Sequence, residues 1–420
     1  MSYTLGILLL VIGIILSVAL HELGHMIPAK KFGAIVPQYM VGFGPTIWST
    51  TRGGTEYGIK WILLGGYVRI LGMFRPALPG QIVGKYEGEP ISSAAYAKLP
   101  SAQKNLVKLT LAEEARQSAA QEIPRGAVGQ PFYQLPAWQK LIVMFGGPVM
   151  NLFLAGLCVV ISFGAIGINA PTNTLAAVPK CAQKQCPSAA SAAGLTAGDT
   201  IVRIGTQQVT DWNEVLAGIR AARGKTEQFT VRRDGALKTV QITVPQGEVP
   251  IGVVSRLERK HFGPGEQAKV LWEQFTGTMG ILARLPMQLW HTFEALTGAE
   301  ERSATGVVSV VGVGRIAGEL AATPKVGILD KIAALVSLWG SVNMALFAFN
   351  LIPLLPLDGG HILGAFFEGA RRRVAKLRSR PNPGPVDTAR LMPLTYVVIG
   401  IFLFMTVLLV AADLLVPVTI

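Results

Sequence analysis

Four long apolar blocks constrain this chain more than any other feature of its sequence. They run from about Thr4 into the segment that carries His21, from Leu141 to Ile168, from Ile332 to Leu357 and from Met392 to Pro417. Each block is close to the roughly 20 residues that a helix needs to cross the hydrocarbon layer of a bilayer. Half of the residues are hydrophobic and only 15% are charged, which is unusual for a soluble protein. The sequence therefore predicts a polytopic α-helical membrane protein with four transmembrane helices.

The positions of lysine and arginine indicate how these helices are oriented. The chain has no lysine or arginine before Lys30 or after Arg390, and basic residues gather in the loop after the first block and in the loop between the last two. Short basic loops tend to stay in the cytoplasm. We therefore expect both loops to be cytoplasmic, and both termini to be extracytoplasmic, in a multi-pass protein of the inner (cytoplasmic) membrane. A signal peptide fits the first block poorly, because no basic residue precedes it and no small-residue cleavage site follows it.

The net charge of +13 indicates that the protein attracts negatively charged partners. Because the basic residues lie at membrane borders, attraction to anionic lipid explains the charge better than nucleic acid does. Cys181 and Cys186 lie in a segment expected outside the membrane, where a small disulfide can form, and the sequence leaves open whether it does.

The segments between the spans differ in composition. Residues 41–73 are rich in glycine, aromatic and β-branched residues and predict short strands joined by turns, at the lipid boundary. Residues 74–134 are polar and interrupted by prolines, with one expected helix around 102–121. Residues 171–256 alternate strands with a helix near 212–223, which is typical of a small α+β domain. The helical run at 267–296 fits either the membrane surface or the face of that domain.

We expect nine parts along the chain, listed here in order: a first transmembrane helix with the HExxH motif (1–29), a membrane-associated β element (30–73), an extended cytoplasmic loop (74–134), a second transmembrane helix (135–170), an extracytoplasmic domain (171–260), an extracytoplasmic helical linker (261–331), a third transmembrane helix ending in an LDG motif (332–362), a basic cytoplasmic loop (363–391) and a fourth transmembrane helix (392–420).

The sharpest chemical signal is the HExxH pattern at residues 21–25. On a helix, His21 and His25 lie on one face and can hold one metal ion, while Glu22 reaches a metal-bound water. Zinc is the expected ion, since it lowers the pKa of bound water toward about 7, and Glu22 can then pass the proton to the leaving amine. Charged groups at the end of an apolar span favour a functional site over a solvated helix end.

A catalytic zinc site usually needs a third protein ligand and an open position for water. Asp358 follows the third block, on the same expected side of the membrane as the two histidines. Pro353 and Pro356 interrupt the helix there, and Gly359 and Gly360 permit tight turns that aim Asp358 sideways. His361 is a weaker candidate, because a fourth protein ligand would close the position that water needs.

These residues resemble the site-2 protease family of intramembrane zinc metalloproteases, in its bacterial RseP-type branch. The resemblance rests on HELGH at 21–25, GFGP at 42–45, FGGPVMN at 145–151 and NLIPLLPLDGG at 350–360, and it spans most of the chain. It implies His21, His25 and Asp358 as zinc ligands and Glu22 as catalytic acid and base.

The resemblance also implies substrate-binding residues. The glycine-rich strands around Gly42 and Gly44 are implied to pair with an unwound substrate, and Asn350 to hold its backbone, although a hydrogen bond in helix packing is the alternative for Asn350. For Asn151, packing of the second span is the favoured interpretation.

The outer domain resembles a PDZ domain, with AAGLTAGDTIVRIGTQQV followed by DWNEVLAGIR. Such domains commonly bind chain ends or extended segments at a sheet edge. In this family a domain of this kind is implied to admit substrates whose outer part has been trimmed. Relatives of the RseP type often carry two such domains, whereas this sequence shows one.

The function implied is regulated intramembrane proteolysis of single-span membrane proteins, such as anti-sigma factors. One alternative is a catalytically silent membrane scaffold that binds partners through its PDZ-like domain, but such a scaffold has no chemical need for Glu22. A metal transporter is another alternative. It would place ligands near the middle of several spans, and it leaves a strand-capturing domain without a role.

Overall fold

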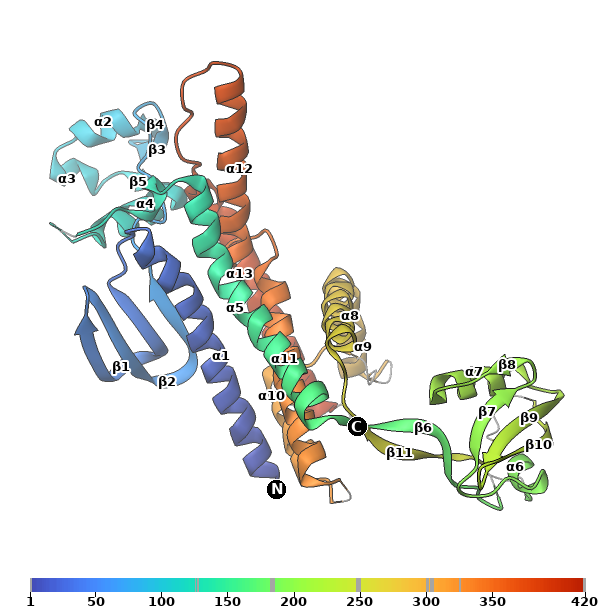
Figure 1. Ribbon diagram of the computed structural model, residues 1–420. Helices are drawn as coiled ribbons and strands as arrows, with labels where there is room; N and C mark the ends of the chain where they lie inside the picture. The colour runs from blue at the N-terminus through green and yellow to red at the C-terminus, as the bar shows by residue number, and fades with distance from the viewer. Residues whose placement is uncertain are drawn as a thin grey trace. The chain divides into compact units, whose positions relative to one another are not determined.

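The computed structural model describes residues 2–124, 126, 128–181, 186–246, 251–299, 302, 306–324 and 326–417. The chain forms two compact units (Figure 1). The larger unit contains Met1–Ile161 and Gly265–Ile420, and the smaller unit contains Ser162–Pro264. Each unit has its own hydrophobic core.

The larger unit is mostly helical. Its helices are α1 (Tyr3–Lys31), α2 (Ser93–Lys98), α3 (Ser101–Lys104), α4 (Leu111–Gln121), α5 (Ala137–Val159), α8 (Pro264–Ala283), α9 (Leu285–Thr297), α10 (Val310–Ala322), α11 (Ile328–Asn350), α12 (Asp358–Leu377) and α13 (Met392–Leu415). Its strands are β1 (Gln38–Arg52), β2 (Thr55–Arg69), β3 (Ile82–Tyr86), β4 (Glu89–Ser92) and β5 (Lys108–Leu109). Short 3₁₀ segments cover Phe132–Gln134 and Thr388–Leu391.

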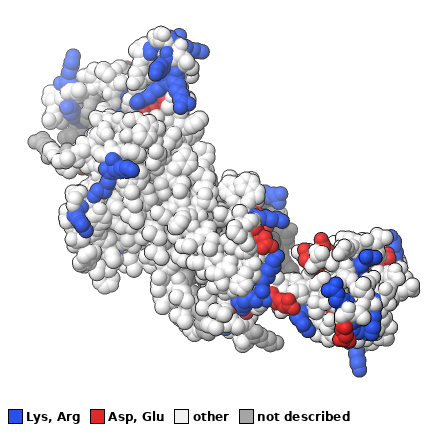
Figure 2. Space-filling view, in the orientation of Figure 1, with Lys and Arg blue, Asp and Glu red and all other residues white. Residues whose placement is uncertain are grey.

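Four described helices are long and apolar enough to cross a membrane, as the sequence predicted. They cover Tyr3–Lys31, Ala137–Ile166, Ile328–Asn350 and Thr388–Leu415. The second of these is α5 continued by a π-helical segment (Val160–Ile166), and the fourth is α13 with the 3₁₀ segment before it. Helix α5 packs against both α1 and α11 (Figure 1). Figure 2 shows that the middle of this unit presents few charged side chains on the visible face, while lysines and arginines gather at the end that carries α12. This distribution is what a membrane protein needs, because charged groups are costly in hydrocarbon.

Two glycines bring α1 and α5 into close contact. A Cβ on Gly24 would overlap the carbonyl oxygen of Gly146, and a Cβ on Gly146 would overlap the carbonyl oxygen of Gly24. Small residues at a crossing point let helix backbones approach closely inside a membrane. The helix with the HExxH motif is thereby held against the FGGP segment of the second span.

The predicted β element is a two-stranded sheet of β1 and β2, whose strands of 15 residues each are longer than the short strands expected from the sequence. Its pairing is irregular, and Tyr39 of β1 is paired with both Tyr57 and Val68 of β2. Several of its large apolar side chains are exposed; they are Phe43, Ile47, Trp48, Ile59, Trp61, Ile62 and Leu63. Exposed apolar groups in this number are typical of a surface that contacts lipid or another protein.

Residues 74–134, expected as an extended loop, contain a small folded element instead. Strands β4, β3 and β5 form a three-stranded sheet in that order, next to α2, α3 and α4. A cluster around the buried side chains of Val83, Ile91 and Val107 holds it together. The strands have only two to five residues each, so their apolar alternation is too short to be recognised in the sequence.

The third apolar helix and the basic loop also differ from expectation. Helix α11 ends at Asn350, so the LDG segment does not end the third span but begins the separate helix α12 at Asp358. Most of the expected loop at 363–391 therefore belongs to that helix, which reaches Leu377. The turn at 351–357 contains Pro353 and Pro356, which a continuous helix tolerates poorly.

The smaller unit is built around one sheet. It contains β6 (Ile168–Ala177), β7 (Thr200–Ile204), β8 (Gln207–Gln208), β9 (Thr226–Arg233), β10 (Ala236–Thr243) and β11 (Val254–Lys260), together with α6 (Ala189–Ala192) and α7 (Trp212–Ala221). The strand order is β10-β9-β7-β6-β11, and β8 pairs with β7. Phe229, Ile201 and Ile242 are fully buried in its core. Cys181 and Cys186 form a disulfide.

Candidate metal centre

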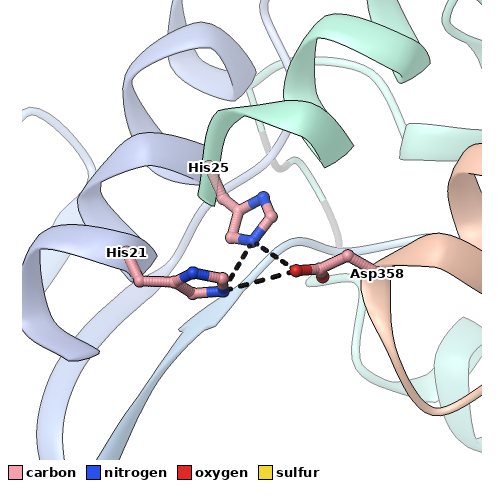
Figure 3. Close-up of side chains that lie close together, drawn as sticks. All are labelled: His21, His25 and Asp358. Atoms are coloured by element: carbon pink, nitrogen blue, oxygen red, sulfur yellow. Dashed lines mark hydrogen bonds and ion pairs between the residues drawn. The ribbon is translucent and has the colours of Figure 1, made fainter. Parts of the chain in front are cut away.

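Three predicted side chains from two helices converge on one point (Figure 3). His21 and His25 project from α1, and Asp358 is the first residue of α12. The Nε2 atoms of the two histidines are 3.2 Å apart, and each lies 3.3 Å from Oδ2 of Asp358. Within the described residues, these three form a group able to hold a metal ion.

The spacing of the three ligand atoms fits a zinc ion. Bonds of about 2.0–2.1 Å to a tetrahedral zinc place neighbouring ligand atoms about 3.3 Å apart. The hydrogen bonding fits as well. Nδ1 of His25 lies 2.8 Å from the carbonyl oxygen of Val143, which can only accept, so the proton sits on Nδ1 and Nε2 keeps its lone pair for the site. Two lone pairs and a carboxylate oxygen at this distance repel one another unless a proton or a metal ion lies between them, and two imidazole nitrogens with one carboxylate oxygen are a donor set that zinc accepts.

The other histidine, His21, is oriented by Asn151. For this asparagine the sequence favours a role in helix packing. Asn151 lies on α5 with 1% of its surface exposed, and its side-chain nitrogen is 3.1 Å from Nδ1 of His21. Its Oδ1 atom is buried without a hydrogen-bond partner among the described residues. Exchanging the two amide atoms gives Oδ1 a donor, because it then accepts from Nδ1–H of His21, and Nε2 of His21 keeps its lone pair for the metal. The buried polar residue near the FGGP motif was the only sequence signal for this role.

Glycines clear the space around the site. A Cβ on Gly147 would overlap Nε2 of His25 and lie 2.7 Å from Nε2 of His21. A Cβ on Gly359 would overlap the carbonyl oxygen of Ile352. Because glycine has no Cβ, the first turn of α12 can pack against the 351–357 turn. Gly359 and Gly360 are thus required for close packing, and neither has the positive φ that the predicted tight turn would have used.

Glu22 lies in the same cavity as the histidines. The cavity has a volume of about 410 Å³, and its lining comprises His21, Glu22, His25, Val68, Arg69, Ile70, Met73, Met144, Asn350, Pro356, Asp358 and His361. Oε2 of Glu22 accepts a hydrogen bond of 2.9 Å from the backbone amide of Val68. The β2 strand therefore forms one wall of the cavity and contacts the carboxylate directly.

The structure brings most, but not all, of the predicted residues together. Asn350, at the end of α11, lines the cavity with Glu22 and the three ligand candidates. Gly42 and Gly44 of β1 are not among the described residues that line it. Both have positive φ, and a Cβ on Gly42 would lie 2.9 Å from the carbonyl oxygen of Ile62, so they serve the irregular pairing of β1 with β2. His361 lines the cavity without joining the ligand group.

Comparisons with known proteins agree with this geometry. The model of the family described as Peptidase family M50 matches residues 9–389. Zinc metalloprotease Rip1 of Mycolicibacterium smegmatis is 31% identical over an alignment that covers all of both chains. Zinc metalloprotease Rip1 of Mycobacterium tuberculosis is 29% identical over all of this chain and 99% of the relative. Zinc metalloprotease RasP of Geobacillus kaustophilus is 27% identical over 84% of this chain and 86% of the relative.

Proposed function

Because this chain belongs to peptidase family M50, the site-2 protease family, and is a membrane-bound zinc metalloendopeptidase, we propose that it cuts single-span membrane proteins within or beside the bilayer. His21, His25 and Asp358 are the proposed zinc ligands, and Glu22 is the proposed catalytic acid and base. The observation that carries this proposal is the convergence of three ligand atoms at 3.2–3.3 Å in the cavity that also holds Glu22.

The chemistry divides between the ion and the chain. A zinc ion held by His21, His25 and Asp358 would supply Lewis-acid activation of a water molecule and of the substrate carbonyl. Glu22 is placed to hold the proton that the attacking water loses and to deliver it to the leaving amine. The Val68 amide holds Oε2 of Glu22, which leaves Oε1 as the oxygen available for proton transfer. Val143 and Asn151 keep the protons of the two imidazoles on the nitrogen away from the reaction.

The substrate is proposed to enter as an extended strand. A peptide bond in a helix has its carbonyl engaged, so the segment must unwind before it can react. Val68 and Arg69 end β2 and line the cavity together with Ile70, so an unwound segment can add to the end of this strand. Asn350 faces the same cavity, where its amide can bond a backbone donor and acceptor. The exposed apolar side chains of β1 and β2 support placement of this sheet at the lipid boundary.

The smaller unit is proposed to be a PDZ-like filter outside the cytoplasm. Support comes from its separate core and from a sheet with β10 and β11 at the two ends of the strand order, where an extended segment can add. The filter admits substrates, such as anti-sigma factors, after their outer part has been trimmed. The distribution of basic residues supports the inner membrane as location, with the zinc site toward the cytoplasm and both termini outside.

The test uses purified protein in vesicles with a trimmed single-span substrate. Glu22→Gln keeps the shape of the side chain but cannot accept the proton. We expect its cleavage rate to fall by about 10²–10⁴-fold while its zinc content stays at the wild-type level. Glu89→Gln, which changes an exposed glutamate of β4, is the matched control and should cleave normally.

Two results would reject the proposal. If wild type holds zinc but cuts no trimmed substrate, the scaffold hypothesis takes its place. If Glu22→Gln cuts as fast as Glu89→Gln, the protease uses another acid and base.

A further inference from the structure

A second cavity in the larger unit is lined by arginines and lies apart from the metal centre. It has a volume of about 650 Å³ and is lined by Arg75, Pro76, Ala77, Leu78, Tyr133, Arg371, Pro383, Gly384, Pro385, Val386, Asp387 and Arg390. Three of these residues are arginines and one is an aspartate, so the lining carries a net charge of +2. The proposed proteolysis assigns no role to this cavity.

The single carboxylate in the lining, Asp387, already accepts hydrogen bonds from a residue outside the lining. Oδ1 and Oδ2 of Asp387 accept hydrogen bonds of 2.8 and 2.7 Å from Nη2 of Arg116, whose side chain is only 3% exposed and does not line the cavity. Gln81 donates a further hydrogen bond of 3.0 Å to Asp387. Asp387 is thus a structural link between the small folded element at 74–134 and the start of the last span.

The positive charges of the three lining arginines are therefore only partly balanced by the one carboxylate of Asp387. Arg75 and Arg390 reach Asp387 at 3.4 and 3.1 Å, but they share it with Arg116. Among the described residues, Arg371 donates to the backbone carbonyls of Pro383 and Gly384, and Arg75 donates to that of Pro76. The Nε atoms of Arg75 and Arg371 are buried with no hydrogen-bond partner in the same part of the chain. Burial and the neighbouring guanidinium groups lower the pKa of Arg75 against the opposing effect of Asp387. Such a site is stabilised by an added anion.

The position of the cavity indicates where that anion comes from. Arg390 belongs to the 3₁₀ segment that leads directly into α13, one of the four candidate spans. Leu391 and Leu394 follow it and have 42% and 47% of their surfaces exposed, and Leu78 in the lining is exposed as well. A phosphate group between the arginines would have an apolar surface beside it for the attached chains. Basic sites at membrane borders commonly bind anionic head groups, and the arginine fork matches phosphate geometry.

We propose that this cavity binds a phosphate-bearing anion, and that the anion is the head group of an anionic phospholipid. Its volume exceeds that of a bare phosphate and lies in the usual range for small-molecule sites. The bound head group neutralises the excess charge of Arg75 and Arg390 and thereby stabilises the junction of the small folded element with α13.

The experiment compares three forms of the full-length protein in detergent. These are the wild type, the cavity variant Arg75→Gln/Arg390→Gln, and the control variant Arg378→Gln/Arg380→Gln. The control removes the same charge from exposed positions outside the lining. Asp387 keeps Arg116 and Gln81 in the cavity variant, and its zinc content reports whether the fold is intact. Phosphatidylglycerol or phosphatidylcholine is added, and retained lipid and the thermal midpoint are measured.

We expect wild type and control to retain phosphatidylglycerol in preference to phosphatidylcholine and to gain thermal stability from it. The cavity variant should bind phosphatidylglycerol about tenfold more weakly or worse, because charge-assisted hydrogen bonds are lost. Equal weakening in the control, or equal retention of both lipids by the wild type, would overturn the proposal. Tighter binding of inorganic phosphate than of phosphatidylglycerol by the wild type would assign the cavity to a soluble phosphate ligand and overturn the lipid assignment.

Discussion

The backbone amide of Val68 donates a hydrogen bond of 2.9 Å to Oε2 of Glu22. The two residues belong to different elements, Val68 to β2 and Glu22 to α1. The strand proposed to hold the substrate therefore also positions the proposed acid and base. This contact couples the placement of the peptide to the placement of the group that acts on it.

Removing the donor at Val68 should slow catalysis without removing zinc. Val68→Pro lacks the amide hydrogen, and a hydrogen bond to a charged group contributes about 1.5–3 kcal/mol, so we expect a cleavage rate about 10–100-fold lower. Val68→Ala shortens the side chain but keeps the donor and is the control. Rates and zinc content are measured together, and equal rates for the two variants would show that the contact does not assist catalysis.

Adding one methyl group at Gly147 should expel the metal. Its Cβ would overlap Nε2 of His25, and α5 could move away only by giving up the close contact of Gly146 with Gly24 on α1. We expect Gly147→Ala to lose most of its zinc in elemental analysis. Gly156→Ala lies on the same helix, where the nearest atom to the new Cβ is 3.7 Å away, and should keep its zinc. A fully loaded Gly147→Ala protein would contradict the site as described.

Asn151 should control zinc affinity through His21. Asn151→Ala removes the acceptor for Nδ1–H of His21, and loss of such an outer partner typically weakens metal binding about 10–100-fold. Asn151→Asp keeps an acceptor at the same place and should bind zinc much more tightly than the alanine variant. Competition with a chelator measures both affinities. The role fails if alanine and aspartate weaken binding equally.

The smaller unit should lose stability in acid through Asp199. This fully buried side chain accepts hydrogen bonds from Arg233 at 2.6 Å and from the Thr196 amide at 2.9 Å. Burial alone would raise the pKa of Asp199, but these hydrogen bonds hold it below its ordinary value of about 3.9. Because the folded pKa is the lower one, the stabilisation is complete above about pH 3.9 and is lost as the pH falls through the folded pKa.

Urea unfolding of the segment 162–264 over a range of pH measures this loss. Asp199→Asn should be less stable at neutral pH, by about 1.5–3 kcal/mol, and should show a smaller decrease in acid. Asp234→Asn, a neighbouring exposed position, should follow the wild-type profile. An unchanged acid profile for Asp199→Asn would assign the decrease to other carboxylates.

Patterns in the sequence reveal those features of the protein that depend on residues close together along the chain. Apolar runs of about 20 residues identify the four spans, and the spacing of His21 and His25 places both on one helix face. Asp358 was within reach because the two prolines before it interrupt the helix and its expected sidedness matches the histidines. The strands of residues 74–134 escaped prediction because so few residues form each one.

The sequence by itself determined the membrane class of this protein, its four apolar helices and the candidate residues of its metal centre. Only the tertiary structure decided which groups surround these residues. Asn151 contacts His21, Gly147 leaves room for both imidazoles, and the amide of Val68 donates to Glu22. It also decided that arginines as distant in sequence as Arg75 and Arg390 share one cavity. The physical reason is that each of these relationships is a contact between segments far apart in the chain. Helical and strand periodicity describe one segment at a time and carry no information about its neighbours in space.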